Sequence, residues 1–428
     1  MTASRTFTIR ARHVLPIVGP PIDGGWVRVE RGRIVAVGRR DRTAGCRDLG
    51  DCVLLPGLVN AHAHLEFSSL GQPLDAAGGL PGWIGRVVAW RRAREAGPEA
   101  PRAIRDAIAA GLAESTAAGV TTIADIATSA AASDRPPTGP RLRVFREGLG
   151  LLPATIEATT RMVARDLDSL ARAGVCAGVS PHAPDSVAAP LGRRLVATAR
   201  DRHLPVAMHI AESEAEQELL ARGTGPFRNL LESLGAWDAA RPPRLLPAAE
   251  WISRLARSSR GIVVHATHIG RDPDALSRVA RHRDRLCVAV CPRTTRAISG
   301  VLPPLALLHA AGIRVCLGTD GRGSNPDLSI LAECRTLVDA GLASPAEALA
   351  MATHHGAWGL GFDRRCGALT PGRAADLLVL RPAAAHPDPF TATLDPATQV
   401  VTVVRSGHII HGALPDHPAE GPRRSLAR

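Results

Sequence analysis

Leu55-Pro-Gly-Leu-Val-Asn-Ala-His-Ala-His64 decides the fold of this chain, because it is an apolar run that ends in two histidines. The apolar part has the length of a buried strand, and the histidines follow at its carboxyl end. Residues two apart in an extended chain point to the same side, so His62 and His64 can both reach one ion. A histidine pair alone is weak support for a metal site, and further ligands have to come from elsewhere in the chain.

Further apolar runs of strand length follow, with amphipathic helical segments between them. Strands are predicted at 54–61, 121–126, 141–147, 176–180, 205–209, 261–265, 286–291 and 314–319. Helical periodicity is found at 103–118, 156–173 and 187–200. This alternation is typical of an α/β fold, a TIM-like (β/α)8 barrel with parallel strands at its centre.

Both ends of the chain have a different texture, with short strands separated by tight turns. Val27 and Val29 alternate with charged residues, and apolar runs return at 377–380 and 400–404. These ends predict one small β-sandwich domain formed from both termini. The expected limits are 1–54 for its first part, 55–360 for the barrel, and 361–428 for its second part and a C-terminal tail.

Three more candidate site residues stand at carboxyl ends of predicted barrel strands, where barrel enzymes build their sites. His209 ends the fifth strand, His265 ends the sixth and Asp320 ends the eighth. Together with His62 and His64 they form a pattern that chance placement seldom produces. The sequence therefore predicts one site at this end of the barrel.

Glu212 lies just beyond His209 and is the candidate proton carrier. A carboxylate there can take a proton from an activated water molecule and pass it to a leaving nitrogen. The alternative is a solvated helix start, because Glu214 and Glu216 make the following turn acidic. We favour catalysis because His209 precedes it.

Two other histidines are assigned to the reacting molecules. His265 is expected to orient the water or the tetrahedral intermediate, and His182, after the fourth strand, is expected to touch the substrate. His268 follows His265 closely and is as readily structural as functional.

In chain order, five motifs resemble those of the amidohydrolase superfamily, in its deaminase and chlorohydrolase branch. They are Leu55 to His64, Ser180-Pro-His-Ala-Pro184, His209-Ile-Ala-Glu212, Val264-His-Ala-Thr-His268 and Leu317-Gly-Thr-Asp320. The strand-rich ends resemble the accessory domain of the superfamily, so the likeness covers nearly the whole chain.

The resemblance implies a ligand set and a division of labour. One divalent ion is expected, Zn²⁺ first with Fe²⁺ as the alternative, and its implied ligands are His62, His64, His209 and Asp320. Glu212 and His265 would then shuttle protons and position the water, with Asp320 counted as catalytic as well as a ligand. Water activated in this way attacks an amidine-type carbon and expels ammonia.

The missing lysine supports a single ion. All 52 basic residues are arginine, so the carbamylated lysine that bridges two metals in other branches of the superfamily cannot form. The end of the fourth strand offers His182 instead.

Substrate assignment rests on a narrower resemblance, to aminofutalosine deaminases, which act on an adenine ring that bears a ribose-derived side chain. It is carried by His64-Leu-Glu-Phe-Ser68, Gly82-Trp-Ile84 and the run from His209 to Ser213 with Gly223-Thr-Gly-Pro226. Glu66 and Arg293 are then candidate substrate contacts, although Glu66 is equally well an exposed loop carboxylate. The turn from Gly321 to Asn325 and the absence of an aromatic residue after Arg293 depart from the pattern and put the exact substrate in doubt.

Three functions stay open from the sequence. The first is a hydrolytic deaminase that releases ammonia from an aminopurine nucleoside or related heterocycle. The second is a hydrolase of the same fold with another leaving group, from a C–Cl or amide C–N bond. The third is a non-catalytic, amidohydrolase-like binding protein, which a complete ligand set with Glu212 disfavours.

Charge does not indicate a macromolecular partner despite a formal net charge of +12. The absence of lysine and tyrosine, both of which have AT-rich codons, fits a GC-rich genome, and few aromatic residues are available to stack on bases. No apolar run reaches the length of a membrane span, and no apolar signal core opens the chain. We expect a cytoplasmic protein with reduced cysteines and a small-molecule substrate, without nucleic acid or membrane, and keep a homodimer as an expectation because the branch often dimerises.

The long segment 66–101 precedes the first clear barrel helix. It is expected to fold over the barrel mouth as a lid does, or to pack between subunits.

Overall fold

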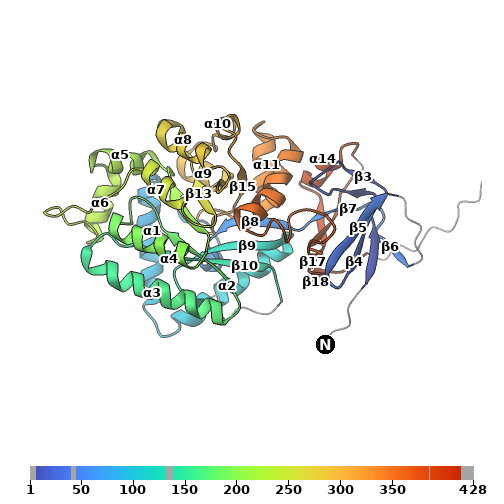
Figure 1. Ribbon diagram of the computed structural model, residues 1–428, viewed down its shortest axis with the longest axis horizontal. Helices are drawn as coiled ribbons and strands as arrows, with labels where there is room; N and C mark the ends of the chain where they lie inside the picture. Colours follow the sequence, from blue (N-terminus) through green and yellow to red (C-terminus); the bar gives the residue numbers. More distant parts are fainter. Residues whose placement is uncertain (1–5, 40–44, 132–137, 385, 416–428) are drawn as a thin grey trace, which may run out of the picture.

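Eight parallel strands surround the centre of the larger domain and follow one another in chain order (Figure 1). The computed structural model describes residues 6–39, 45–131, 138–384 and 386–415. The strands are β8 (Leu58–Ala63), β9 (Val120–Ala127), β10 (Arg141–Gly148), β11 (Cys176–Pro181), β12 (Val206–Ile210), β13 (Gly261–His265), β14 (Leu286–Val290) and β15 (Val315–Leu317). A parallel bridge between Ala63 and Asp320 brings the first strand against the last. The predicted (β/α)8 barrel is confirmed.

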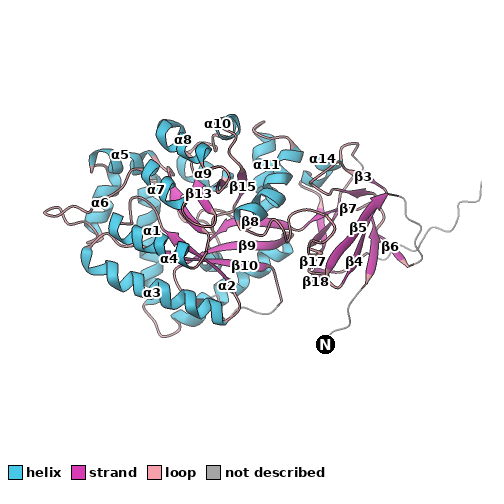
Figure 2. Cartoon of the chain, in the orientation of Figure 1, coloured by secondary structure: helices cyan, strands magenta, loops and turns pink. Residues whose placement is uncertain are grey.

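Helices lie around these strands (Figure 2), and many of them bury an apolar face in the core that they share with the strands. They are α1 (Gly79–Glu95), α2 (Ala100–Ala117), α3 (Pro153–Arg172), α4 (Ala189–Asp201), α5 (Glu214–Arg222), α6 (Pro226–Ser233), α7 (Ala248–Leu255), α8 (Pro273–Arg281), α9 (Pro292–Ser299), α10 (Leu305–Ala310), α11 (Ile330–Asp339), α12 (Pro345–Ala350), α13 (Gly356–Gly359) and α14 (Pro389–Leu394). Shorter turns are η1 (Leu65–Ser69), η3 (Ile269–Arg271) and the π-helical η4 (Met351–His355). None of the helices within the described ranges combines the length and hydropathy needed to cross a bilayer.

The single strand predicted at 54–61 is wrong, because two strands occupy this stretch. β7 (Val53–Pro56) pairs with β16 (Leu377–Arg381) in the small domain, whereas β8 pairs with β9 in the barrel. Gly57 stands between them, and a Cβ at this position would lie 2.1 Å from a side-chain carbon of Thr121. Glycine is therefore needed where the chain passes from one sheet to the other.

The small domain contains strands from both ends of the chain, which lie side by side in Figure 1. One sheet has the order β5-β4-β1-β6 and the other β18-β17-β16-β7-β2-β3. The new strands are β1 (Phe7–Arg10), β2 (His13–Val14), β3 (Ile22–Asp23), β4 (Gly25–Glu30), β5 (Arg33–Arg39), β6 (Cys46–Asp48), β17 (Gln399–Arg405) and β18 (His408–Gly412). Apolar residues of both sheets share one core, as expected of a β domain formed from both ends, while the predicted tail lies from residue 416 onward outside the described residues.

A buried ion pair connects the two domains. Arg141, at the start of β10, donates from Nη1 to Oδ2 of Asp376 over 2.7 Å, and Asp376 precedes β16 in the small domain. The other carboxylate oxygen of Asp376 accepts the backbone N–H of Ser406 at 2.9 Å. Both ionic side chains are nearly inaccessible to solvent, so neither charge has water as an alternative partner.

We expect Asp376→Asn to lower the free energy of unfolding by about 3–5 kcal/mol, because it leaves the Arg141 charge buried without a counter-ion. Urea denaturation of the purified protein measures this loss. Glu157→Gln, at the exposed pair between Glu157 and Arg194, is the matched control and should leave the urea midpoint almost unchanged, because exposed ion pairs contribute little to stability. Equal small losses for both variants would contradict a structural role for the buried pair.

Candidate metal and substrate site

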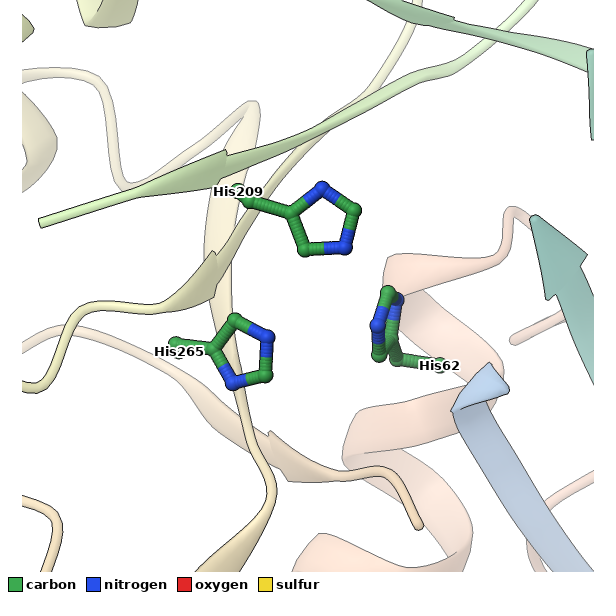
Figure 3. A group of neighbouring side chains, drawn as sticks. All are labelled: His62, His209 and His265. Carbon is green, nitrogen blue, oxygen red and sulfur yellow. The ribbon is translucent and has the colours of Figure 1, made fainter. Parts of the chain in front are cut away.

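Four histidine rings meet at the carboxyl ends of the barrel strands. His62 lies near the end of β8, His209 in β12 and His265 at the end of β13, and Figure 3 shows these three rings facing one another. The ring centre of His62 lies 5.0 Å from the ring centre of His64, 5.0 Å from that of His209 and 5.5 Å from that of His265. Nε2 of His64 lies 3.3 Å from Nε2 of His209, so the predicted pattern does converge on one point.

Asp320 reaches the same point through the closure of the barrel. β15 ends at Leu317, and Gly318 then passes so close to β8 that a Cβ would lie 2.7 Å from the Cβ of His62. The backbone N–H of Asp320 donates to the carbonyl of His62 at 3.1 Å, and Asp320 adopts a left-handed φ of 57°. Its Oδ1 consequently lies 3.4 Å from Nε2 of His62 and 3.5 Å from Nε2 of His64.

These side chains fit a divalent ion. Among the described residues, neither ring nitrogen of the fully buried His62 has a hydrogen-bond partner, and Nδ1 of His64 has none. Burial lowers the pKa of His62 to about 3, and it lowers the pKa of His64 and His209 well below the usual value. Neutral imidazoles beside a carboxylate are the donor set that Zn²⁺ or Fe²⁺ accepts, and an ion at this point would supply the partner that Nε2 of His62 otherwise lacks.

Neighbouring groups orient two of these side chains. Nδ1 of His209 lies 2.8 Å from the backbone carbonyl of His182, which fixes the ring with Nε2 toward the centre. The hydroxyl of Ser324 donates to Oδ2 of Asp320, and Thr294 lies 2.9 Å from that hydroxyl. Such contacts hold the donor atoms in place before an ion arrives.

Glu212 lies beside this centre, as predicted. Its Oε1 is 3.4 Å from Nε2 of His265, and burial, followed by the charge of Asp320, raises the pKa of Glu212 well above its usual value. Glu216 accepts the backbone N–H groups of Ala211 at 2.9 Å and of Glu212 at 2.8 Å. Glu216 therefore fixes the turn that carries Glu212, a role that its place in an acidic helix start did not reveal.

A cavity of about 290 Å³ opens onto this centre. Its floor is polar and includes His64, His209, Glu212, His265, Asp320, His182, Asp185 and Ser186. Its wall is apolar and comes mainly from α1 and α6, with Leu80, Trp83, Ile84, Val87 and Val88 facing Phe227, Leu230 and Leu231. The segment predicted to cover the barrel mouth thus supplies one side of this cavity.

The remaining predicted residues divide into two groups. His182 lines the cavity, with Nδ1 beside the hydroxyl of Ser186 at 2.5 Å. Glu66 is buried and bonded to two arginines, so the reading as an exposed loop carboxylate is wrong, and neither Glu66 nor Arg293 is among the cavity-lining residues. Arg293 donates from both Nη atoms to the carboxylate of Asp327 over 2.7 and 3.0 Å, so an ion pair within the protein engages its side chain.

Three charged residues in or near the cavity were missed from the sequence. Asp185 lines it directly after the motif from Ser180 to Pro184. Arg91 lines it from α1, a helix rich in arginines that the sequence does not distinguish from one another. Glu147, at the end of β10, is buried behind His182, with its Oε1 4.0 Å from Nε2 of that ring. The strand-end rule that identified the histidines could have identified Glu147 as well.

Comparison with known proteins places this geometry among hydrolases. The sequence model of the amidohydrolase family matches residues 53–410. A relative from Moorella thermoacetica, named a 5-methylthioadenosine/S-adenosylhomocysteine deaminase, is 29% identical over 93% of this chain and 92% of its own length. A relative of the same name from Halobacterium salinarum is also 29% identical, over 86% of this chain and 82% of its own.

Two solved structures share the fold. Aminofutalosine deaminase of Helicobacter pylori, in complex with methylthio-coformycin, superposes with a TM-score of 0.82 at 23% identity, over 94% of this chain and 99% of that one. An adenosine deaminase of Xanthomonas campestris with bound zinc has a TM-score of 0.70 at 25% identity, over 94% and 92% of the two chains.

Proposed function

The chain belongs to the amidohydrolase family and is a hydrolytic deaminase that acts on a C–N bond, and we propose that its substrate is an aminopurine nucleoside with an apolar 5′ arm. The observation that carries this proposal is the cavity over the candidate metal site, which has a polar floor at the strand ends and an apolar wall between α1 and α6. A purine ring suits the floor and an uncharged arm suits the wall, because a buried charge without a partner is costly.

We assign His62, His64, His209 and Asp320 as the residues that hold one divalent ion, and Zn²⁺ as that ion. The unpartnered buried nitrogens support this ligand set, and the zinc-containing adenosine deaminase of X. campestris supports the choice of metal. The bound ion would lower the pKa of a water molecule enough to supply a nucleophile near neutral pH. Metal analysis of the protein purified without added metal tests the assignment, and iron in place of zinc would correct it.

Glu212 and His265 then serve the proton transfers. Glu212 accepts a proton as water adds to the carbon that bears the amino group, and it returns a proton to the leaving nitrogen, so that ammonia departs. His265, whose Nε2 lies 3.4 Å from Oε1 of Glu212, holds the water-derived oxygen that is now bonded to the same carbon.

His182 and Asp185 complete the floor as contacts to the purine ring. Both line the cavity, and burial lowers the pKa of His182 to about 3 and raises that of Asp185 to about 6. A neutral imidazole presents one donor and one acceptor, and a carboxyl with a pKa of about 6 is mainly an acceptor at neutral pH. Together they can meet the acceptor nitrogens and the amino group of a purine edge.

We expect 5′-methylthioadenosine to be deaminated with at least about tenfold higher kcat/KM than adenosine. The reason is that its apolar arm is transferred from water to the apolar wall between α1 and α6. Ammonia release by the purified, metal-assayed protein measures this, in a panel that includes aminofutalosine. Leu231→Gln in the wall should reduce the preference, while Val301→Gln, an exposed residue outside the cavity, should not. Equal rates on both nucleosides would contradict the apolar-arm assignment, and no release from any of them, with one ion bound per chain, would favour another leaving group.

The finer assignments are proposals with tests of their own. A cytoplasmic location can be tested by cell fractionation, a homodimer by sedimentation velocity, and domain limits at 54/55 and 360/361 by limited proteolysis.

A further inference from the structure

We infer that Arg91, fixed in place by Glu66, binds the ribose hydroxyls of the substrate; the inference rests on the proposed nucleoside deaminase function. Neither residue belongs to the metal centre, yet one lines the cavity and the other holds it there. Glu66 is in this view a positioning residue that acts through Arg91.

Glu66 is the anchor of α1 on the barrel. It lies in η1, directly after the metal-site strand, and is 5% exposed. Its Oε1 accepts from Nη2 of Arg91 at 2.5 Å and its Oε2 from Nη2 of Arg94 at 2.7 Å. Arg94 also donates to the backbone carbonyl of Glu66 at 2.9 Å, so two arginines almost one turn apart hold the helix against this carboxylate.

Arg91 keeps donors for a ligand. A guanidinium carries five N–H groups, and the bond to Glu66 uses Nη2. Its Nη1 makes no hydrogen bond to any described residue and, unlike its Nε, is not buried. An accessible donor on a residue that lines the cavity can meet an acceptor on a ligand there.

The place of Arg91 along the cavity identifies the part of the substrate that it meets. Its guanidinium carbon lies 5.2 Å from the ring centre of Phe67, and that ring lies 5.9 Å from the ring of His64, so Arg91 lies near the polar floor. On α1 it follows Val87 and Val88, the last apolar residues of the wall, by about one turn. A ring on the floor and a 5′ arm along the wall leave the sugar beside Arg91.

The charge of Arg91 also selects the kind of acceptor. Glu66 pairs with both Arg91 and Arg94, and Glu95 lies 3.8 Å from Arg94. Two carboxylates thus balance the two guanidinium charges, so a neutral oxygen is accommodated without a further counter-ion. Ribose hydroxyls are such acceptors, and a guanidinium that is held from one side spans two adjacent oxygens in a fixed geometry.

Removing a ribose hydroxyl from the substrate tests this inference. We would compare 5′-methylthioadenosine with its 2′-deoxy and 3′-deoxy analogues, in the intact holoenzyme. The wild-type protein should lose about 10- to 100-fold in kcat/KM on at least one analogue, the range expected when a charged hydrogen bond is lost. Arg91→Met should lose a similar factor on the parent nucleoside and lose no further activity on the analogues.

Two more variants separate positioning from folding. Glu66→Gln should raise KM more than it lowers kcat and should reduce the deoxy penalty, because Arg91 is no longer held. Arg91→Lys keeps the charge without the planar fork and should lose most of the penalty. Arg86→Met is the matched control on α1, since Arg86 pairs with the exposed Asp75 outside the cavity, and it should keep the full penalty.

The outcomes are distinguishable. A wild-type protein that deaminates both deoxy analogues as well as the parent overturns the inference, whatever the variants do, and so does an Arg91→Met protein that keeps the deoxy penalty. Either result would leave the deaminase assignment standing. If no nucleoside releases ammonia, the proposed function fails and this inference falls with it.

Discussion

Glu212→Gln is expected to lower the rate of ammonia release by about 10²- to 10⁴-fold, the contribution of a positioned general acid–base, while the ion stays bound. Glutamine keeps the size of the side chain but cannot carry the proton from water to the leaving nitrogen. Glu216 holds the backbone of Ala211 and Glu212 through its own carboxylate, so the turn should keep its shape in the variant.

Two measurements on the same sample check this expectation: the turnover rate and the metal content per chain. Glu214→Gln is the matched control, because Glu214 is a nearby but exposed carboxylate that pairs with Arg271; its turnover should match the wild type. A Glu212→Gln protein that retains turnover would remove Glu212 from the reaction, and one that loses its ion would show that Glu212 supports the metal site instead.

His62→Ala is expected to release the ion and to lower turnover by about three orders of magnitude or more, since a catalytic ion is worth several kcal/mol of the barrier. His62 faces the other candidate ligands with both ring nitrogens buried and unpartnered among the described residues. Loss of one strong ligand from a set of four opens the site to water and weakens the remaining bonds.

Removal of the ion from the wild-type protein should also lower its stability. If the free ion stands at about a thousand times its dissociation constant, its removal costs about 4 kcal/mol of unfolding free energy. Chelation followed by urea denaturation measures this, and addition of Zn²⁺ should restore both activity and stability. His268→Ala is the control, since His268 lies outside the cavity with Nδ1 4.0 Å from Glu214, and an equal loss of metal there would contradict the ligand assignment.

The barrel and its strand-end histidines could be predicted because their signals are local. A buried strand requires a run of apolar residues, and residues at positions i and i+2 of a strand point to the same face. His62, His209 and His265 each end such a run, and equivalent ends of parallel strands meet at one rim of a barrel. Periodicity within a few residues was therefore sufficient to bring together side chains far apart in the chain.

Contacts between side chains of different elements could be identified only from the tertiary structure. The sequence predicts Glu66 as a substrate contact or an exposed carboxylate, but in the structure it is bonded to Arg91 and Arg94 of α1. Arg293, the other predicted contact, is bonded to Asp327 and does not line the cavity.

The sequence by itself thus determined the fold class and the side chains that converge at the strand ends. The tertiary structure decided which charges are satisfied within the protein and which remain for a ligand. The physical reason is that strand and helix periodicity is written into neighbouring residues, whereas the partner of a charged side chain is whichever opposite charge the packing of distant elements brings within reach.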